Sequence, residues 1–221
     1  MQSEIIDNLT KIAFLADASE EALLALASKT KVIKFPKKAM ILSEGDQTSS
    51  LYVILSGKVR IFGLNDKDKE LTLLIQEAGS HFGELALLSN EPRSAAVEAL
   101  EKTVCGVISK ADFIHWLKQY PDAAISLLSE LAGKVRFLTE KVKQMALSNV
   151  YERTISVLQD MADKEGDIYV IHNRPTQHEL ATMVGASREM INKVMKELIK
   201  GGYISVDEKK LKIEHTPPTS W

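Results

Sequence analysis

Residues 81–97, HFGELALLSNEPRSAAV, place one acid and one base among small apolar residues, and this combination could bind an anion. Glu84 lies nine residues before Arg93, and Ser94 follows directly. A guanidinium and a hydroxyl can both donate hydrogen bonds to anionic oxygens, and the guanidinium adds its charge. Small neighbouring residues would let the backbone approach a ligand closely. The alternative is that Glu84 and Arg93 pair with each other over an empty interior.

A second group of polar residues, near the C-terminus, is typical of a helix that reads DNA. Thr176 and Glu179 form a T-x-x-E capping box that predicts a helix start, and Ser187 can begin a second helix after the turn at Gly185. On the second helix, one face is predicted to carry Arg188, Glu189, Asn192, Lys193 and Lys196. Such side chains can bond guanine, cytosine and phosphates, and residues near the start of a helix reach the bases of a major groove. The alternative is a solvated face of mixed charge.

The segments that must position these two groups differ in residue pattern and in predicted secondary structure. Residues 1–30 predict short helices, whereas residues 31–108 contain short β-branched runs separated by turn signals, which predict an all-β roll or barrel. After Gly201-Gly202, the segments ISV and LKIEH predict a hairpin, or wing, beside the helix pair. The segment YERTISVLQDMADKEG predicts one helix that ends at Gly166.

Between these regions, an apolar seam predicts one long helix. Its members are separated alternately by four and three residues: Ala124, Leu128, Leu131, Val135, Leu138, Val142 and Met145. Gly133, within this helix, lowers the stability of the helix by roughly 1 kcal/mol relative to alanine. A narrow seam on a polar helix predicts pairing with a second copy of the chain, and the alternative is packing on its own domain.

Composition excludes several classes of protein. The 221 residues carry a formal net charge of −2, so any anion site must be local. One cysteine, Cys105, excludes an iron–sulfur or zinc site built from several cysteines. We expect no secretory signal, no membrane span, no enzyme motif and a cytoplasmic location. A haem would need an axial ligand, and the one candidate, His81, is expected at the surface.

The motifs GELALL…PRSA, within residues 83–95, and ELATMVGASREMINKVMKEL, residues 179–198, resemble those of the cyclic AMP receptor protein / fumarate-nitrate reduction regulator family of bacterial transcription factors. The resemblance covers about residues 10–213 and implies an α+β fold. It implies a cyclic-nucleotide-binding β-roll with N-terminal helices in residues 1–121, a dimerisation helix in 122–149, and a winged helix-turn-helix in 150–221.

The resemblance also implies roles for the residues of the first motif. Arg93, Ser94 and the Ala95 N–H would hold the phosphate of cAMP or another cyclic nucleotide. Glu84 would accept from the ribose 2′-hydroxyl, with the backbone of Gly83 and Leu85 at the sugar. The base would contact residues placed by alignment: Ile61, Leu73, Leu138 and Thr139. Two positions depart from the cAMP sensors, because Leu138 replaces a hydroxyl residue and Leu74 replaces a serine. No metal, haem or iron–sulfur cluster is implied.

For the second motif, the resemblance implies a homodimer that binds double-stranded DNA and RNA polymerase, and no membrane. Arg188, Glu189 and Lys193 match base-reading positions, with lysine in place of the usual arginine at the third. Thr176, Gln177 and Ser187 would contact phosphates of a pseudo-palindrome with TGTGA-like half-sites. The implied function is allosteric transcription regulation by a cyclic nucleotide. The alternative is a member that binds DNA constitutively, with a vestigial or differently occupied pocket.

Overall fold

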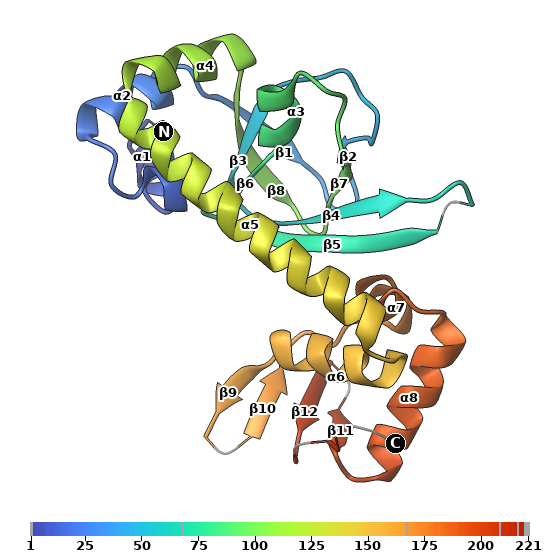
Figure 1. Cartoon of the computed structure of the whole chain (residues 1–221). Helices are drawn as coiled ribbons and strands as arrows, with labels where there is room; N and C mark the ends of the chain where they lie inside the picture. The colour runs from blue at the N-terminus through green and yellow to red at the C-terminus, as the bar shows by residue number, and fades with distance from the viewer. Residues whose placement is uncertain (1, 68, 167, 208, 216, 219–221) are drawn as a thin grey trace. The chain divides into compact units, whose positions relative to one another are not determined.

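The computed structural model describes residues 2–67, 69–166, 168–207, 209–215 and 217–218. It divides the chain into two compact units, residues 1–137 and 138–221 (Figure 1). Helices and strands are both present in each unit, as expected for an α+β protein. None of the described helices is long and apolar enough to cross a membrane.

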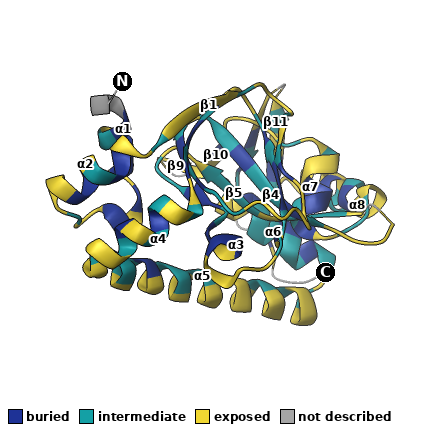
Figure 2. Ribbon diagram, turned by 90° about the horizontal axis from the view of Figure 1, so that it is seen from above, coloured by how far each residue is buried: buried dark blue, intermediate teal, exposed yellow. Residues whose placement is uncertain are grey.

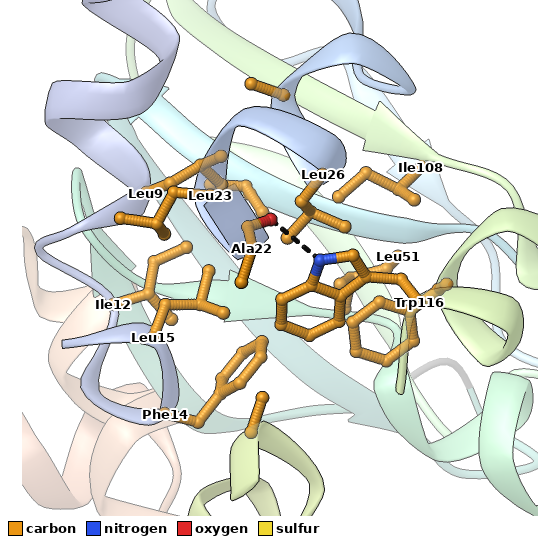
Figure 3. Close-up of a cluster of buried hydrophobic side chains, with 14 of the residues drawn as sticks. Leu9, Ile12, Phe14, Leu15, Ala22, Leu23, Leu26, Leu51, Ile108 and Trp116 are labelled. Atoms are coloured by element: carbon orange, nitrogen blue, oxygen red, sulfur yellow. Dashed lines mark hydrogen bonds between the residues drawn. The ribbon is translucent and has the colours of Figure 1, made fainter. Parts of the chain in front are cut away.

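Helices from both ends of the first unit build its largest apolar core. They are α1 (Gln2–Leu9), the 3₁₀ helix η1 (Ala13–Leu15), α2 (Glu20–Ser28) and α4 (Lys110–Gln119). The hydroxyls of Ser19 and Ser109 cap α2 and α4 by accepting from backbone N–H groups. Trp116 of α4 donates its indole N–H to the Ala22 carbonyl at 2.8 Å, which ties α4 to α2 inside the core (Figure 3).

Two antiparallel sheets form the β-roll that the short runs predicted. One sheet has the order β1-β8-β3-β6, with β1 Lys31–Phe35, β8 Thr103–Ile108, β3 Leu51–Ser56 and β6 His81–Phe82. The other has the order β2-β7-β4-β5, with β2 Met40–Leu42, β7 Ala96–Ala99, β4 Lys58–Leu64 and β5 Glu70–Glu77. The short helix α3 (Glu84–Ser89) follows β6 directly. Cys105 of β8 is fully buried, and burial raises the pKa of its thiol to about 12.

Helix α5 (Pro121–Leu147) is continuous and contains the predicted seam. Ala123 and Leu127 are buried in the first unit, whereas exposed positions recur along most of the helix (Figure 2). Leu128, Val135 and Val142 of the seam are 65%, 64% and 64% exposed. A Cβ built on Gly133 would meet no atom within 4 Å. The alternative, in which the seam packs on its own domain, is therefore wrong for these three positions.

The second unit contains the predicted helix pair and hairpin. Its elements are α6 (Val150–Asp160), β9 (Asp163–Glu165), β10 (Ile168–Ile171), α7 (Gln177–Val184), α8 (Arg188–Lys200), β11 (Ile204–Asp207) and β12 (Lys210–Ile213). The strands form one antiparallel sheet in the order β11-β12-β10-β9. Ile191 and Leu198 of α8 are fully buried in the core of this unit.

The prediction that the helix after residue 150 ends at Gly166 is wrong. Helix α6 ends at Asp160, and residues 163–165 form β9, which pairs with β10. The sequence DKEG contains residues compatible with a helix, but pairing with β10 supplies backbone hydrogen bonds that a last helical turn would leave unmade. Gly166 has φ 62° and lies between β9 and β10. It therefore serves a strand connection and not a helix end.

Candidate functional site

Arg93 lies inside the β-roll, where neutral oxygens hold its guanidinium. Its Nη1 donates to the Gly83 carbonyl at 2.7 Å and its Nη2 to the Ser50 carbonyl at 2.9 Å. Its Nε donates to the Thr48 hydroxyl at 3.1 Å. The residue is only 3% exposed. Three contacts, two from residues 48–50 and one from Gly83, therefore fix the orientation of this side chain.

No carboxylate of the described residues forms an ion pair with Arg93. Burial lowers the pKa of the guanidinium, and the nearby Tyr52, Asp46 and Glu84 oppose this shift. The Tyr52 ring lies 5.9 Å from the guanidinium carbon. Arginine remains charged in proteins, and a buried charge is costly without a partner of opposite sign. The site is therefore electrostatically suited to an anion.

Gly83 allows the guanidinium to come this close. It has φ 86°, in the left-handed region, and a Cβ at this position would lie 2.6 Å from Arg93 Nη1 and 2.9 Å from the Ser50 carbonyl oxygen. Real Cβ atoms do not approach other atoms so closely. Both the backbone conformation and the space around it therefore require glycine.

Glu84 pairs with a residue of α5 and not with Arg93, so the predicted alternative of a Glu84–Arg93 pair is wrong. Glu84 is 5% exposed, and its Oε1 accepts a hydrogen bond from Lys134 Nζ at 2.9 Å. Lys134 Nζ also lies 3.6 Å from Glu130 Oε1. Lys134 thus connects the long helix to the start of α3.

His81 completes this buried cluster, and the expectation of a surface histidine is wrong. It is 1% exposed, and its ring meets the Phe14 ring edge-on at 5.0 Å. Its Nε2 lies 3.4 Å from Lys134 Nζ, and its Nδ1 lies 3.6 Å from Glu130 Oε1. Burial and then Lys134 lower the pKa of His81 from 6.5, while Glu84 and Glu130 oppose them. A neutral ring protonated on Nδ1 fits both neighbours, because Nε2 then accepts from Lys134.

Sequence reasoning missed Lys134 and Glu130. A signal was available, because positions 123, 127, 130 and 134 have separations of 4, 3 and 4, which defines a second face of the helix beside the seam. Ala123 and Leu127 of this face are buried. Two charged residues that continue a buried face predict an ionic contact with the domain beneath it.

The remaining residues predicted to bind a nucleotide are more dispersed. Ile61 of β4 is half-buried opposite Leu74 of β5. The pairing of these strands shifts next to this position, and Leu73 is the extra residue in the bulge. Ser94 and Leu85 are exposed, and Ala95 is half-buried. Leu138 and Thr139 belong to the second unit. Among the described residues, no group of three or more His, Cys, Asp or Glu could hold a metal ion.

The helix pair of the second unit forms locally from the predicted caps. The Thr176 hydroxyl accepts from the Glu179 N–H, and the Ser187 hydroxyl accepts from the Met190 N–H. Gly185 ends α7 with φ 69°, in the left-handed region. Arg153 of α6 then fastens the pair by donating to the Val184 carbonyl at 3.1 Å.

The outward face of α8 matches the predicted set. Four of its five members are exposed and Asn192 is half-buried: Arg188, Glu189, Asn192, Lys193 and Lys196. The pKa of the Glu189 carboxyl is lowered, because the backbone N–H of Glu189 and then the Ser187 hydroxyl form hydrogen bonds with it. The side-chain amide of Gln177 donates to Asn192 Oδ1 at 3.1 Å. This face therefore presents positive charge, one ionised acceptor and one tethered amide.

Together, the fold and these two sites define a regulator that joins a ligand-binding β-roll to a helix-turn-helix domain. Two family models match the chain: a cyclic nucleotide-binding domain over residues 32–120, and a Crp-like helix-turn-helix domain over residues 152–217. The cAMP-activated global transcriptional regulator CRP of Salmonella typhimurium is 30% identical over 196 residues, which cover 86% of this chain and 92% of the relative. The chain therefore belongs to the cyclic AMP receptor protein / fumarate-nitrate reduction regulator family of DNA-binding transcription regulators.

Further relatives cover nearly the whole chain. The CRP-like cAMP-activated global transcriptional regulator of Mycobacterium tuberculosis is 26% identical over 209 residues, 93% of both chains. The catabolite activator protein of Thermus thermophilus has a TM-score of 0.57 at 26% identity, over 91% of this chain and 93% of that one. The c-di-GMP responsive regulator CLP of Xanthomonas campestris shares the fold, with a TM-score of 0.80 at 22% identity, over 90% of this chain and all of that one.

Proposed function

We propose that this regulator is a homodimer that a cyclic nucleotide, cAMP as first candidate, switches between states of different DNA affinity. The observation that carries the proposal is Arg93, a buried guanidinium that only neutral oxygens of the described residues hold. A single phosphate charge would balance it. Arginine has five N–H donors, and three nitrogens here each make one contact, so two N–H groups remain for phosphate oxygens.

The ribose would then lie at the start of α3. Glu84 can accept from a 2′-hydroxyl while Lys134 compensates the charge of its carboxylate. Ser94 and the Ala95 N–H would complete the phosphate site, with the backbone of Gly83 and Leu85 at the sugar. The base would contact Ile61 and Leu73 of the roll.

The names of two relatives support cAMP as the effector, since both are described as cAMP-activated. Leu74 and Leu138 cannot bond a base amino group, which favours weak discrimination between bases. Calorimetric titration with cAMP, cGMP and cyclic di-GMP tests this. We expect the first two to bind, with affinities within about tenfold. Binding of cyclic di-GMP alone would redirect the proposal, and binding of none would favour the constitutive alternative.

Dimerisation would bury the exposed seam of α5. Leu128, Val135 and Val142 recur every seven residues, which suits pairing of two parallel helices. Sedimentation of Val142→Glu tests this, with Leu147→Glu, which adds the same charge at an 83% exposed position off the seam, as a control. We expect only Val142→Glu to produce monomers, and two dimeric variants would contradict the pairing.

The switch itself would use α5, which runs from the ligand-binding unit into the DNA-binding unit. A ligand that bonds differently to two arrangements of the helix pair would bias the DNA-binding units toward one spacing. RNA polymerase is the proposed further partner of the bound dimer. The test is operator affinity with and without saturating cAMP. Equal affinities would remove the switch from the proposal and retain DNA binding.

A further inference from the structure

A hydrogen bond between the two helices of the helix-turn-helix holds the side-chain amide of Asn192, which lies on the outward face of α8. Gln177 is the first residue of α7, and Asn192 is the fifth residue of α8. Gln177 Nε2 donates to Asn192 Oδ1 at 3.1 Å, and both residues are half-buried. The turn at Gly185 separates the two residues in sequence. The contact therefore links the start of α7 to the outward face of α8.

Asn192 lies among the side chains proposed to meet DNA. It follows Arg188 by four residues and precedes Lys196 by four, so all three share one face of α8. The preceding residue, Ile191, is fully buried. Asn192 is therefore placed where a base edge can be reached while its oxygen is still bonded to α7.

An asparagine amide has two different ends. Its oxygen accepts, and its nitrogen carries two donors. An unrestrained asparagine pairs with adenine through both ends, because adenine presents N7 as acceptor and its N6 amino group as donor. When the oxygen is turned to Gln177, the nitrogen faces outward. Guanine, with O6 and N7, and thymine, with O4, present only acceptors to this nitrogen, whereas adenine offers N7 beside an amino group that is itself a donor.

We propose that Gln177 is a positioning residue that fixes the Asn192 amide with its nitrogen outward, so that α8 selects guanine or thymine at the base that Asn192 faces. This inference rests on the proposed role of the α8 face in DNA reading. It assigns Gln177 a part in sequence selection beyond a phosphate contact. One hydrogen-bonded contact of this kind corresponds to a preference of about tenfold.

The experiment measures relative affinities for a symmetric operator in which each half-site position is changed in turn to all four base pairs. Asn192→Ala identifies the position, because it removes the preference there and leaves the others. Gln177→Ala frees the amide, and we expect the preference for guanine or thymine to fall about tenfold, with adenine gaining. Gln177→Glu replaces the donor by an acceptor, which turns the Asn192 nitrogen inward and its oxygen outward. We expect this variant to favour adenine or cytosine, whose amino groups are donors.

His178→Ala is the matched control, since His178 is the next residue of α7 and is exposed. It should leave every preference unchanged. The added charge of Gln177→Glu weakens all operators alike, so only ratios between operators are compared. Retention of the wild-type preference within twofold in both Gln177 variants would overturn the inference. So would a uniform loss of affinity in Asn192→Ala, which indicates a phosphate contact. Failure of the wild-type protein to prefer any operator would instead defeat the proposed DNA-reading face.

Discussion

The charged residues of the β-roll are buried, whereas most of those on the outward face of α8 are exposed. Arg93 and Glu84 are 3% and 5% exposed, and every contact around them is fixed by backbone or by a partner side chain. Arg188 and Lys193 are exposed, and no carboxylate of the described residues lies within ion-pair distance of either. A buried charge is costly unless protein groups stabilise it in the absence of the ligand as well. An exposed charge is stabilised by water until a partner binds.

The difference predicts how each region responds to substitution. In the roll, a change should cost stability and ligand affinity together, because the same contacts serve both. On α8, a change should cost DNA affinity or selectivity and leave folding intact, because surface substitutions away from special contacts have small effects on stability.

The largest effect is expected for Gly83→Ala. The new methyl would meet Arg93 Nη1 and the Ser50 carbonyl, so we expect a loss of about 3 kcal/mol in unfolding free energy and abolished nucleotide binding. Gly45→Ala is the matched control, because Gly45 has φ 85° but no atom within 4 Å of a Cβ. It should lose about 1 kcal/mol from backbone strain alone. Chemical denaturation and calorimetry measure both, and equal losses would show that the close approach is unimportant.

A smaller effect is expected when the charge of Glu84 is removed. Lys134–Glu84 and Lys141–Asp160 are similar pairs at 2.9 and 3.1 Å, but the side chain of the acid alone is 6% exposed in the first and 61% exposed in the second. Glu84→Gln should lower the unfolding free energy by about 2 kcal/mol, and Asp160→Asn by about 0.3 kcal/mol. Denaturant titration at low and high salt checks this. A loss in Asp160→Asn as large as that in Glu84→Gln would contradict the role of burial.

On α8, Arg188→Ala should reduce specific operator affinity by about 10- to 100-fold, because we propose that Arg188 contacts a base. The unfolding transition should not change, because Arg188 is exposed. Lys200→Ala, at the far end of the same helix, is the control and should weaken binding little. Fluorescence anisotropy against specific and scrambled duplexes separates the two, and equal loss on both duplexes would assign Arg188 to the phosphates.

The smallest effect concerns pH. The pKa of His81 is lowered on folding, so the unfolded chain binds more protons below about pH 6.5. This contribution to the unfolding free energy is complete above pH 6.5 and is lost as the pH falls toward the native pKa. One proton limits the slope to about 1.4 kcal/mol per pH unit. In His81→Phe the slope should be shallower between pH 7 and 5, and identical slopes would exclude a neutral buried histidine.

Local signals were enough to predict most of the fold. Thr176, Ser187 and Gly185 act on their own helix ends, so their roles follow from neighbouring residues. The strands of the roll likewise follow from alternating runs and turns. The order of the parts followed from the same residue patterns and agrees with the family resemblance, and the matching family models confirm the β-roll and helix-turn-helix classes.

The ionic cluster around Glu84 could not be predicted in the same way. His81 and Lys134 are 53 residues apart, and their contact depends on how α5 passes the roll. A single histidine at a turn gives no local sign of such a partner. The strand β9 was missed for a related reason, since its pairing with β10 outweighs the helical preference of its residues.

Cys105 has a practical consequence. It is the one thiol of the chain, it is sealed inside the roll, and its pKa of about 12 leaves almost no thiolate at neutral pH. The native protein is therefore a nearly blank background for site-directed labelling. A cysteine placed on an exposed position of α8 would take a spin label or fluorophore selectively. In the proposed dimer, the spacing between the two labels could be followed during a titration with cyclic nucleotide.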